Sequence, residues 1–223
     1  MLPRTLEPEV MDSAEEAQGY DAMDHDAVNH RFVDDFLAVL GPAADDPRMS
    51  VLDVGAGTAQ IPIRLARAAP ALSITAIDLA AEMLRVAREN VVRERLEDRI
   101  RLLQRDAKRL PDPDGAYASV ISNSIVHHIP EPAAVFREMR RVLRPGGVWF
   151  VRDLLRPDSS GRVEDLVAAY AGEADAHQRR MFRESLHAAL TLAEVRGLAG
   201  ELGLPPESVT QTSDRHWTLA ARV

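Results

Sequence analysis

The chain of 223 residues contains no cysteine. Disulfide bonds, zinc sites built from thiolates and a cysteine nucleophile are therefore excluded. No apolar run approaches the roughly 20 residues that a membrane-spanning helix needs, and residues 1–12 are acidic, unlike a signal peptide. Basic residues are few, with 27 Lys and Arg against 35 Asp and Glu, which disfavours a broad contact with nucleic acid. These absences predict a cytoplasmic protein with neither a membrane nor nucleic acid as its partner.

What the chain does contain is alternating apolar segments. Hydrophobic residues make up 46% of it, which suits one α/β domain. Residues 1–18 are rich in Pro, Glu and Asp and are expected to be flexible, so that residues 19–223 form the domain. Strands are expected at 50–54, 73–78, 100–104, 118–122 and 148–153, with helical segments between them, which predicts a parallel sheet with helices on both faces. The tail adds helices over 163–190 and 192–202, and then an antiparallel hairpin at 208–212 and 216–223.

A glycine-rich turn follows the first of these strands. Gly55 and Gly57 allow a tight turn and a close approach to a ligand, and Asp78 ends the next strand about 20 residues later, where it can accept hydrogen bonds from ribose hydroxyls. A dinucleotide fingerprint would place a third glycine where Gln60 stands, and Asp53 would repel a phosphate. An acid at this position instead suits a cationic ligand.

The pattern from Asp53 to Ala59 resembles motif I of the class I S-adenosylmethionine (SAM)-dependent methyltransferases, with Ala59 in place of the last glycine. Residues 137–147 are similar to the segment before strand five of small-molecule methyltransferases, close to the quinone-biosynthesis type. SAM carries an ammonium and a sulfonium but no phosphate, in agreement with Asp53. The resemblance implies a Rossmann-like, seven-stranded, mostly parallel sheet with a C-terminal antiparallel hairpin. It also implies a helical lid over 19–45 and a helical insertion on the acceptor side over 155–190.

The resemblance carries over site residues position by position. The donor, with S-adenosylhomocysteine as its product, would be bound by residues of the strand ends and the lid: Asp53, Gly55, Ala56, Gly57, Thr58, Gln60, Asp78, Leu79, Met83, Asp106, Ala107, Asn123, Ser124 and Tyr20. The acceptor would meet side chains of the lid and the insertion: Asn29, His30, Arg31, Tyr170, His177 and Arg180. Each of these acceptor residues can instead belong to an ordinary charged surface.

Methyl transfer requires in-line positioning of donor and acceptor, and a base only where the acceptor must lose a tightly held proton. His128, His127 and Asp153 are the candidate catalytic residues, although one histidine can instead cap or pack under its loop. The metal site of catechol-type O-methyltransferases is incomplete here, with Asn123 and Asp153-Leu154 at its positions, so no metal is predicted.

We therefore predict methyl transfer from SAM to a small polar or anionic metabolite. The alternatives are a methyltransferase acting on a macromolecule such as tRNA or a protein, and a non-catalytic SAM-binding module. An NAD-dependent oxidoreductase is disfavoured by Gln60 and Asp53. The sequence allows methylation of an oxygen, nitrogen, carbon or sulfur atom, and it is compatible with a homodimer.

Overall fold

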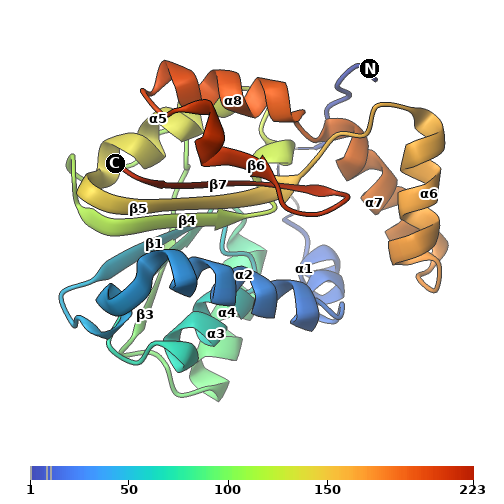
Figure 1. The fold of residues 1–223 in the computed structure, drawn as a ribbon. Helices are drawn as coiled ribbons and strands as arrows, with labels where there is room; N and C mark the ends of the chain where they lie inside the picture. Colours follow the sequence, from blue (N-terminus) through green and yellow to red (C-terminus); the bar gives the residue numbers. More distant parts are fainter. Residues whose placement is uncertain (1, 9, 11) are drawn as a thin grey trace.

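A seven-stranded sheet forms the centre of the molecule (Figure 1). The computed structural model describes residues 2–8, 10 and 12–223. The strand order is β3-β2-β1-β4-β5-β7-β6, with β7 antiparallel to both of its neighbours and β1 to β5 parallel. This topology confirms the predicted fold class. The strand bounds are β1 Ser50–Val54, β2 Ser73–Asp78, β3 Ile100–Gln104, β4 Tyr117–Asn123, β5 Leu143–Leu154, β6 Val209–Gln211 and β7 His216–Arg222.

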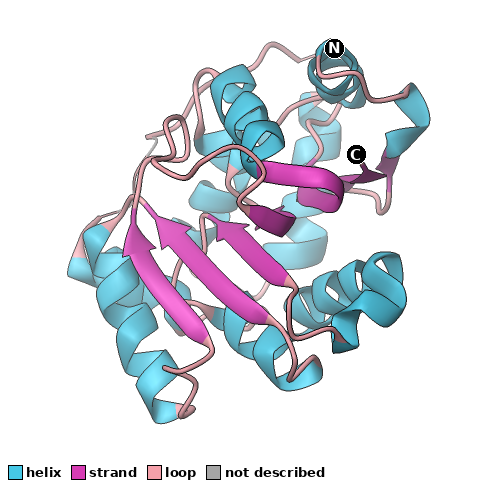
Figure 2. Ribbon diagram, turned by 90° about the vertical axis from the view of Figure 1, so that its left-hand side faces the viewer, coloured by secondary structure: helices cyan, strands magenta, loops and turns pink. Residues whose placement is uncertain are grey.

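Helices cover both faces of the sheet (Figures 1 and 2). The α2, α3 and α4 helices lie on one face, and α5 and α8 lie on the other. Neighbouring strand residues serve opposite faces: Val51 belongs to the core under α2, and Leu52 to the core under α5. Because both faces are covered, the central strands are buried on both sides and mostly apolar rather than alternating. The helix bounds are α2 Asp26–Leu40, α3 Gln60–Ala68, α4 Ala81–Arg93, α5 Pro132–Val142 and α8 Leu192–Glu201.

The N-terminal part of the chain differs from the flexible segment that its composition predicts. Of residues 1–18, positions 1, 9 and 11 lie outside the described residues. The α1 helix (Ala14–Asp21) begins at a capping box, in which Ser13 and Glu16 satisfy each other's backbone N–H groups. Its Ala17 is buried against α4. The expected domain boundary at residue 19 therefore falls inside a helix, and the remaining boundaries stay predictions.

The predicted insertion contains two helices, α6 (Ser160–Ala171) and α7 (Ala176–Ala188). They pack on each other beside the carboxyl end of β5, at the right of Figure 1. A backbone hydrogen bond from Thr5 N–H to the carbonyl of His187 ties the start of the chain to α7. No helix among the described residues is long and apolar enough to cross a membrane.

Candidate active site

The glycine-rich turn between β1 and α3 is fixed by the backbone of the neighbouring strand. The amides of Gly55 and Ala56 both donate to the carbonyl of Ile77, at 2.9 Å. Gly55 has φ of +76°, and a Cβ placed there would lie 2.1 Å from Cγ2 of Ile125. Only glycine combines this backbone conformation with this close approach. Ala59, which stands where the motif has its last glycine, also adopts a left-handed conformation with φ of +66°.

A cavity of about 130 Å³ opens at the carboxyl ends of the strands. The structure brings most of the predicted donor residues and one of the predicted catalytic residues together around it. From these two sets the lining includes Tyr20, Gly55, Gly57, Asp78, Leu79, Met83, Asp106, Ala107, Asn123, Ser124 and His128. Val10, from the N-terminal part of the chain, also lines it.

A smaller hollow adjoins this cavity at the glycine-rich turn. It is lined by the remaining predicted donor residues, together with one predicted acceptor residue: Asp53, Ala56, Thr58, Gln60 and Asn29. Tyr20 and Asn123 line both spaces. Asn29 donates to Oε1 of Gln60 at 2.9 Å, so it supports the donor side of the site rather than the acceptor side.

Three polar atoms at this hollow are buried without a hydrogen-bond partner: Asp53 Oδ2, Thr58 Oγ1 and Asn123 Oδ1. Burial, together with the charge of Asp78, raises the pKa of Asp53 to about 8. Buried polar atoms are normally paired, so this group is arranged for a ligand. An ammonium group could donate to Asp53 Oδ2 and to Asn123 Oδ1, and its positive charge would favour the ionised form of Asp53.

Asp78 is held at the tip of β2 by backbone amides. Its Oδ2 accepts from Gly57 N–H at 2.8 Å, and its Oδ1 accepts from Ala80 N–H at 2.9 Å. A carboxylate has about four acceptor positions, so both oxygens keep capacity for ribose hydroxyls. Burial raises its pKa, and these backbone hydrogen bonds oppose that shift.

At the other end of the cavity, the lining combines apolar side chains with the carboxylate of Asp106. Leu79 is 37% exposed and Met83 is buried, and both line the cavity. Asp106 accepts from the amide of Lys108 at 2.9 Å and pairs with its ammonium group at 3.2 Å. An aromatic ring bearing an exocyclic amine, as in adenine, matches this combination of apolar walls and a carboxylate.

The loop between β4 and α5 that carries His127 and His128, here called the histidine loop, does not place all three candidate catalytic residues at the cavity. Asp153 is 1% exposed and does not line the cavity. Its oxygens accept from Val126 N–H and Leu154 N–H, each at 2.6 Å, and from Nδ1 of His127 at 2.5 Å. Every described contact directs this carboxylate under the loop, so the contact between Asp153 and the acceptor stays a prediction.

His127 is also buried, with 4% of its surface exposed. Burial alone would lower its pKa, but the carboxylates of Asp153 and Glu7 outweigh burial and raise it. Burial alone would raise the pKa of Asp153, but the charge of His127 and the hydrogen bonds from His127, Leu154 and Val126 together lower it. His127 therefore holds a proton more tightly than a free imidazole and lies buried behind the loop, whereas its neighbour His128 lines the cavity.

Two N-terminal residues that the sequence prediction did not include contact this loop. Glu7 pairs with Nδ1 of His128 at 3.1 Å and with Nε2 of His127 at 3.5 Å. Arg4 donates to the carbonyl oxygens of Ala188, Pro130, His127 and Ile129 at 2.7 to 3.1 Å. Both residues lie in a segment whose composition gives no sign of ordered contacts.

The other predicted acceptor residues lie away from the cavity. His30 is exposed and pairs with Asp34, and Arg31 is exposed on the same helix. On the α6–α7 pair, Tyr170 donates to Asp214, while Arg180 contacts His177 on the exposed surface. None of the five lines the cavity or the hollow beside it, and their assignment to the acceptor stays a prediction.

Residues 51–147 match the methyltransferase domain family. The chain is 33% identical over 191 residues to the 27-O-demethylrifamycin SV methyltransferase of Amycolatopsis mediterranei, covering 84% of this chain and 65% of that protein. It is 34% identical over 192 residues to the malonyl-[acyl-carrier protein] O-methyltransferase of Geobacter sulfurreducens, covering 82% and 67%. The chain belongs to the class I SAM-dependent methyltransferases.

The chain aligns with about two thirds of the length of these two relatives. The methyltransferase fold extends over nearly the whole chain: a SAM-dependent methyltransferase from Aquifex aeolicus superposes with a TM-score of 0.67 at 18% identity, covering 95% of this chain and 98% of that one. SAM is accordingly the cosubstrate of this methyltransferase, and S-adenosylhomocysteine is the product. The unpaired polar atoms at the glycine-rich turn fit the amino-acid end of this donor.

Proposed function

We propose that this methyltransferase transfers the methyl group of SAM to a small polar or anionic metabolite by in-line displacement. The observation that carries the proposal is the closure of the site. The N-terminal segment (residues 2–8) is fastened by Arg4 across the histidine loop, and Val10 and Tyr20 line the cavity. A narrow, covered space favours a small acceptor over a folded macromolecule, and the net charge of −8 disfavours RNA.

The donor would be held at three points along the strand ends. Asp53 and Asn123 would accept from its ammonium, Asp78 from its ribose hydroxyls, and Asp106 from the adenine amine. The donor supplies an activated methyl group, so the protein's own contribution is to orient the two reactants and exclude water. Tyr20 serves the second purpose: burial raises its pKa to about 12, so it covers the donor as a neutral phenol.

His128 is our candidate for contact with the acceptor. It lines the cavity beside Ser124, whereas His127 is buried behind it. An imidazole at this position can orient a hydroxyl group of the acceptor or take up the proton that the acceptor releases. We assign a positioning function to His127 and Asp153, which hold the loop that presents His128.

A second candidate is an acceptor attached to a carrier protein. The observation in its favour is the name of the Geobacter sulfurreducens relative, whose acceptor is linked to an acyl carrier protein. Such an acceptor would reach the covered cavity through a flexible arm and not through the carrier itself. Comparing a carrier-bound ester acceptor with the same group on a short thiol would separate the two candidates.

The test of the main proposal begins with calorimetric titration of SAM, S-adenosylhomocysteine and NAD into the protein. We expect micromolar binding of the first two compounds and none of NAD. The Asp78→Ala variant should lose this binding while remaining folded, and a matched Asp165→Ala change on the exposed face of α6 should retain it. Labelled SAM with a panel of small hydroxylated and carboxylated acceptors then tests transfer. Binding of neither adenosyl compound by folded protein would reject the proposal.

A further inference from the structure

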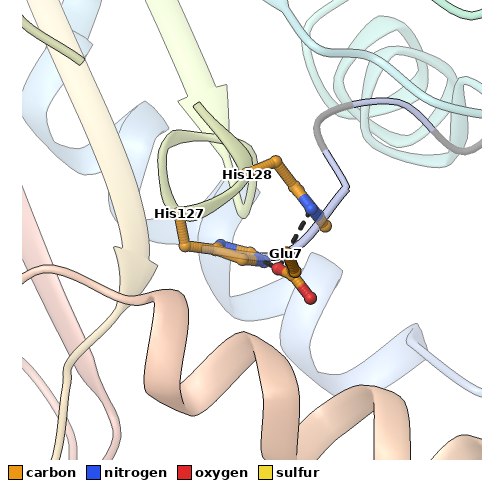
Figure 3. A group of neighbouring side chains, drawn as sticks. All are labelled: Glu7, His127 and His128. Atoms are coloured by element: carbon orange, nitrogen blue, oxygen red, sulfur yellow. Dashed lines mark ion pairs between the residues drawn. The ribbon is translucent and has the colours of Figure 1, made fainter. Parts of the chain in front are cut away.

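Three potential metal ligands from distant parts of the chain converge beside the cavity (Figure 3). Glu7 comes from the N-terminal segment, and His127 and His128 come from the short η2 helix (Val126–His128) after β4. Oε1 of Glu7 lies 3.1 Å from Nδ1 of His128 and 3.5 Å from Nε2 of His127. One ligand atom from each of the three residues lies within 4.8 Å of the others.

The two separations from Glu7 to the histidines match the edges of a metal polyhedron. Zinc–nitrogen and zinc–oxygen bonds are about 2.0–2.1 Å, so two ligands of a tetrahedral ion lie about 3.4 Å apart. The two measured edges bracket this value. Two imidazole nitrogens and one carboxylate oxygen form a donor set that zinc uses when a fourth position stays open.

The atoms that face one another are also poorly satisfied without a further partner. Glu7 Oε1 and His128 Nδ1 are both buried and make no aligned hydrogen bond, although they are close enough to form an ion pair. Buried polar atoms usually have an aligned partner. A cation lying between the two atoms would satisfy both of them.

The second coordination layer is already in place. Nδ1 of His127 donates to Asp153 at 2.5 Å, which directs Nε2 toward Glu7, as in carboxylate–histidine–metal arrangements. Ser185 donates to Oε2 of Glu7 at 3.2 Å, and the hydrogen bonds of Arg4 hold the segment that carries Glu7. A metal ion replaces the protons that the two histidines hold at their ligand atoms, and the carboxylates of Glu7 and Asp153 then face the guanidinium of Arg4, so the local charge favours the ion.

We propose that Glu7, His127 and His128 bind a divalent transition metal ion, with zinc as the best match. Three protein ligands leave a fourth position open. Because His128 lines the cavity, the ion lies at the cavity wall, where an oxygen atom of the acceptor can take that position. The ion would also fasten the N-terminal segment over the site. This location differs from the incomplete catechol-type site, because Asn123 takes no part in it and Asp153 acts only through His127.

The test is metal binding to the full chain after treatment with a chelator. We expect calorimetry with zinc chloride to show one equivalent bound, and magnesium chloride to show none. Cobalt should give the visible absorption of a tetrahedral ion with nitrogen and oxygen ligands, since the chain has no cysteine. Glu7→Gln and His128→Gln should each weaken zinc binding by about 100-fold. Matched changes on the exposed α6–α7 surface, Glu164→Gln and His177→Gln, should leave it unchanged.

Circular dichroism and SAM binding establish that each variant is folded, and the buried His127 need not be changed. Absence of stoichiometric zinc binding by folded wild-type protein would overturn the proposal and leave the three residues as an ion-paired latch. Zinc binding that persists in Glu7→Gln and His128→Gln would overturn it as well, because the ion would then be held elsewhere. Both results are independent of methyl transfer, so this proposal and the proposed function can fail separately.

Discussion

The buried Asp53 carboxyl group should limit the stability of the ligand-free protein. Asp53 is 2% exposed, and its Oδ2 has no hydrogen-bond partner. Replacing it with asparagine keeps the shape of the side chain and removes the ionisable group. We therefore expect Asp53→Asn to stabilise the protein while weakening SAM binding by at least about tenfold, a loss of about 1.4 kcal/mol.

The magnitude follows from the pKa. The ordinary value of 3.8 and the value of about 8 in the folded protein lie about four pH units apart, and each unit corresponds to about 1.4 kcal/mol. At neutral pH the unfolded chain has released the Asp53 proton while the folded protein retains it. The free energy of unfolding is therefore lower by about 4 kcal/mol at that pH, which is the ceiling for the gain in Asp53→Asn.

The sign of the pH dependence is also determined. A raised folded-state pKa leaves stability intact below about pH 4 and reduces it progressively up to about pH 8. The difference in unfolding free energy between Asp53→Asn and wild type should therefore grow across this window and stay constant above it. Calorimetric melting of ligand-free protein should show the gain as a rise of at most about 8–16 °C at neutral pH, since 1 kcal/mol shifts the melting temperature of a domain of this size by about 2–4 °C. A variant that is less stable than wild type at every pH, or a difference that does not change with pH, would refute this reasoning.

Three further predictions address the turn, the N-terminal segment and the hairpin. Gly55→Ala should abolish SAM binding and lower stability by about 1–3 kcal/mol in urea denaturation, because its Cβ meets Ile125, whereas Gly161→Ala, with open space around its Cβ, should not destabilise. Arg4→Ala should accelerate amide exchange at residues 127–129 and 187–188, since it removes four carbonyl contacts. Burial lowers the pKa of His216 to about 4 from 6.5, so the unfolded chain takes up a proton first as the pH falls. Wild type should lose about 3 kcal/mol between these values, and His216→Gln should flatten the loss in urea denaturation at several pH values.

The sheet could be predicted closely because its signal is local. The bounds of β1, β2 and β3 coincide with the predicted ranges, since buried parallel strands appear as short apolar runs between turn residues. The first helix was missed although its capping box, Ser13 to Glu16, is visible in the sequence. The acids and prolines around it predict a flexible segment, in conflict with this local helix signal.

The site was predictable in part, because strand ends determine where a residue lies but not which way its side chain points. Asp53 and Asp78 meet the cavities at the ends of β1 and β2, whereas Asp153, at the end of β5, turns beneath the histidine loop. Glu7 could not be found at all from local pattern. It lies more than a hundred residues from its partners, and only the tertiary fold brings the three together.

The volume of the cavity gives the N-terminal region a further importance. About 130 Å³ is below the roughly 300 Å³ at which pockets for small molecules begin, so the bound donor needs additional room. Val10 and Tyr20 line this space, and α1, which carries Tyr20, rests on α4 through small side chains such as Ala17. Glu7 of the same region reaches the histidine loop at the acceptor end. Entry of the donor and closure of the acceptor wall therefore involve one continuous stretch of chain, which links the two ends of the site mechanically.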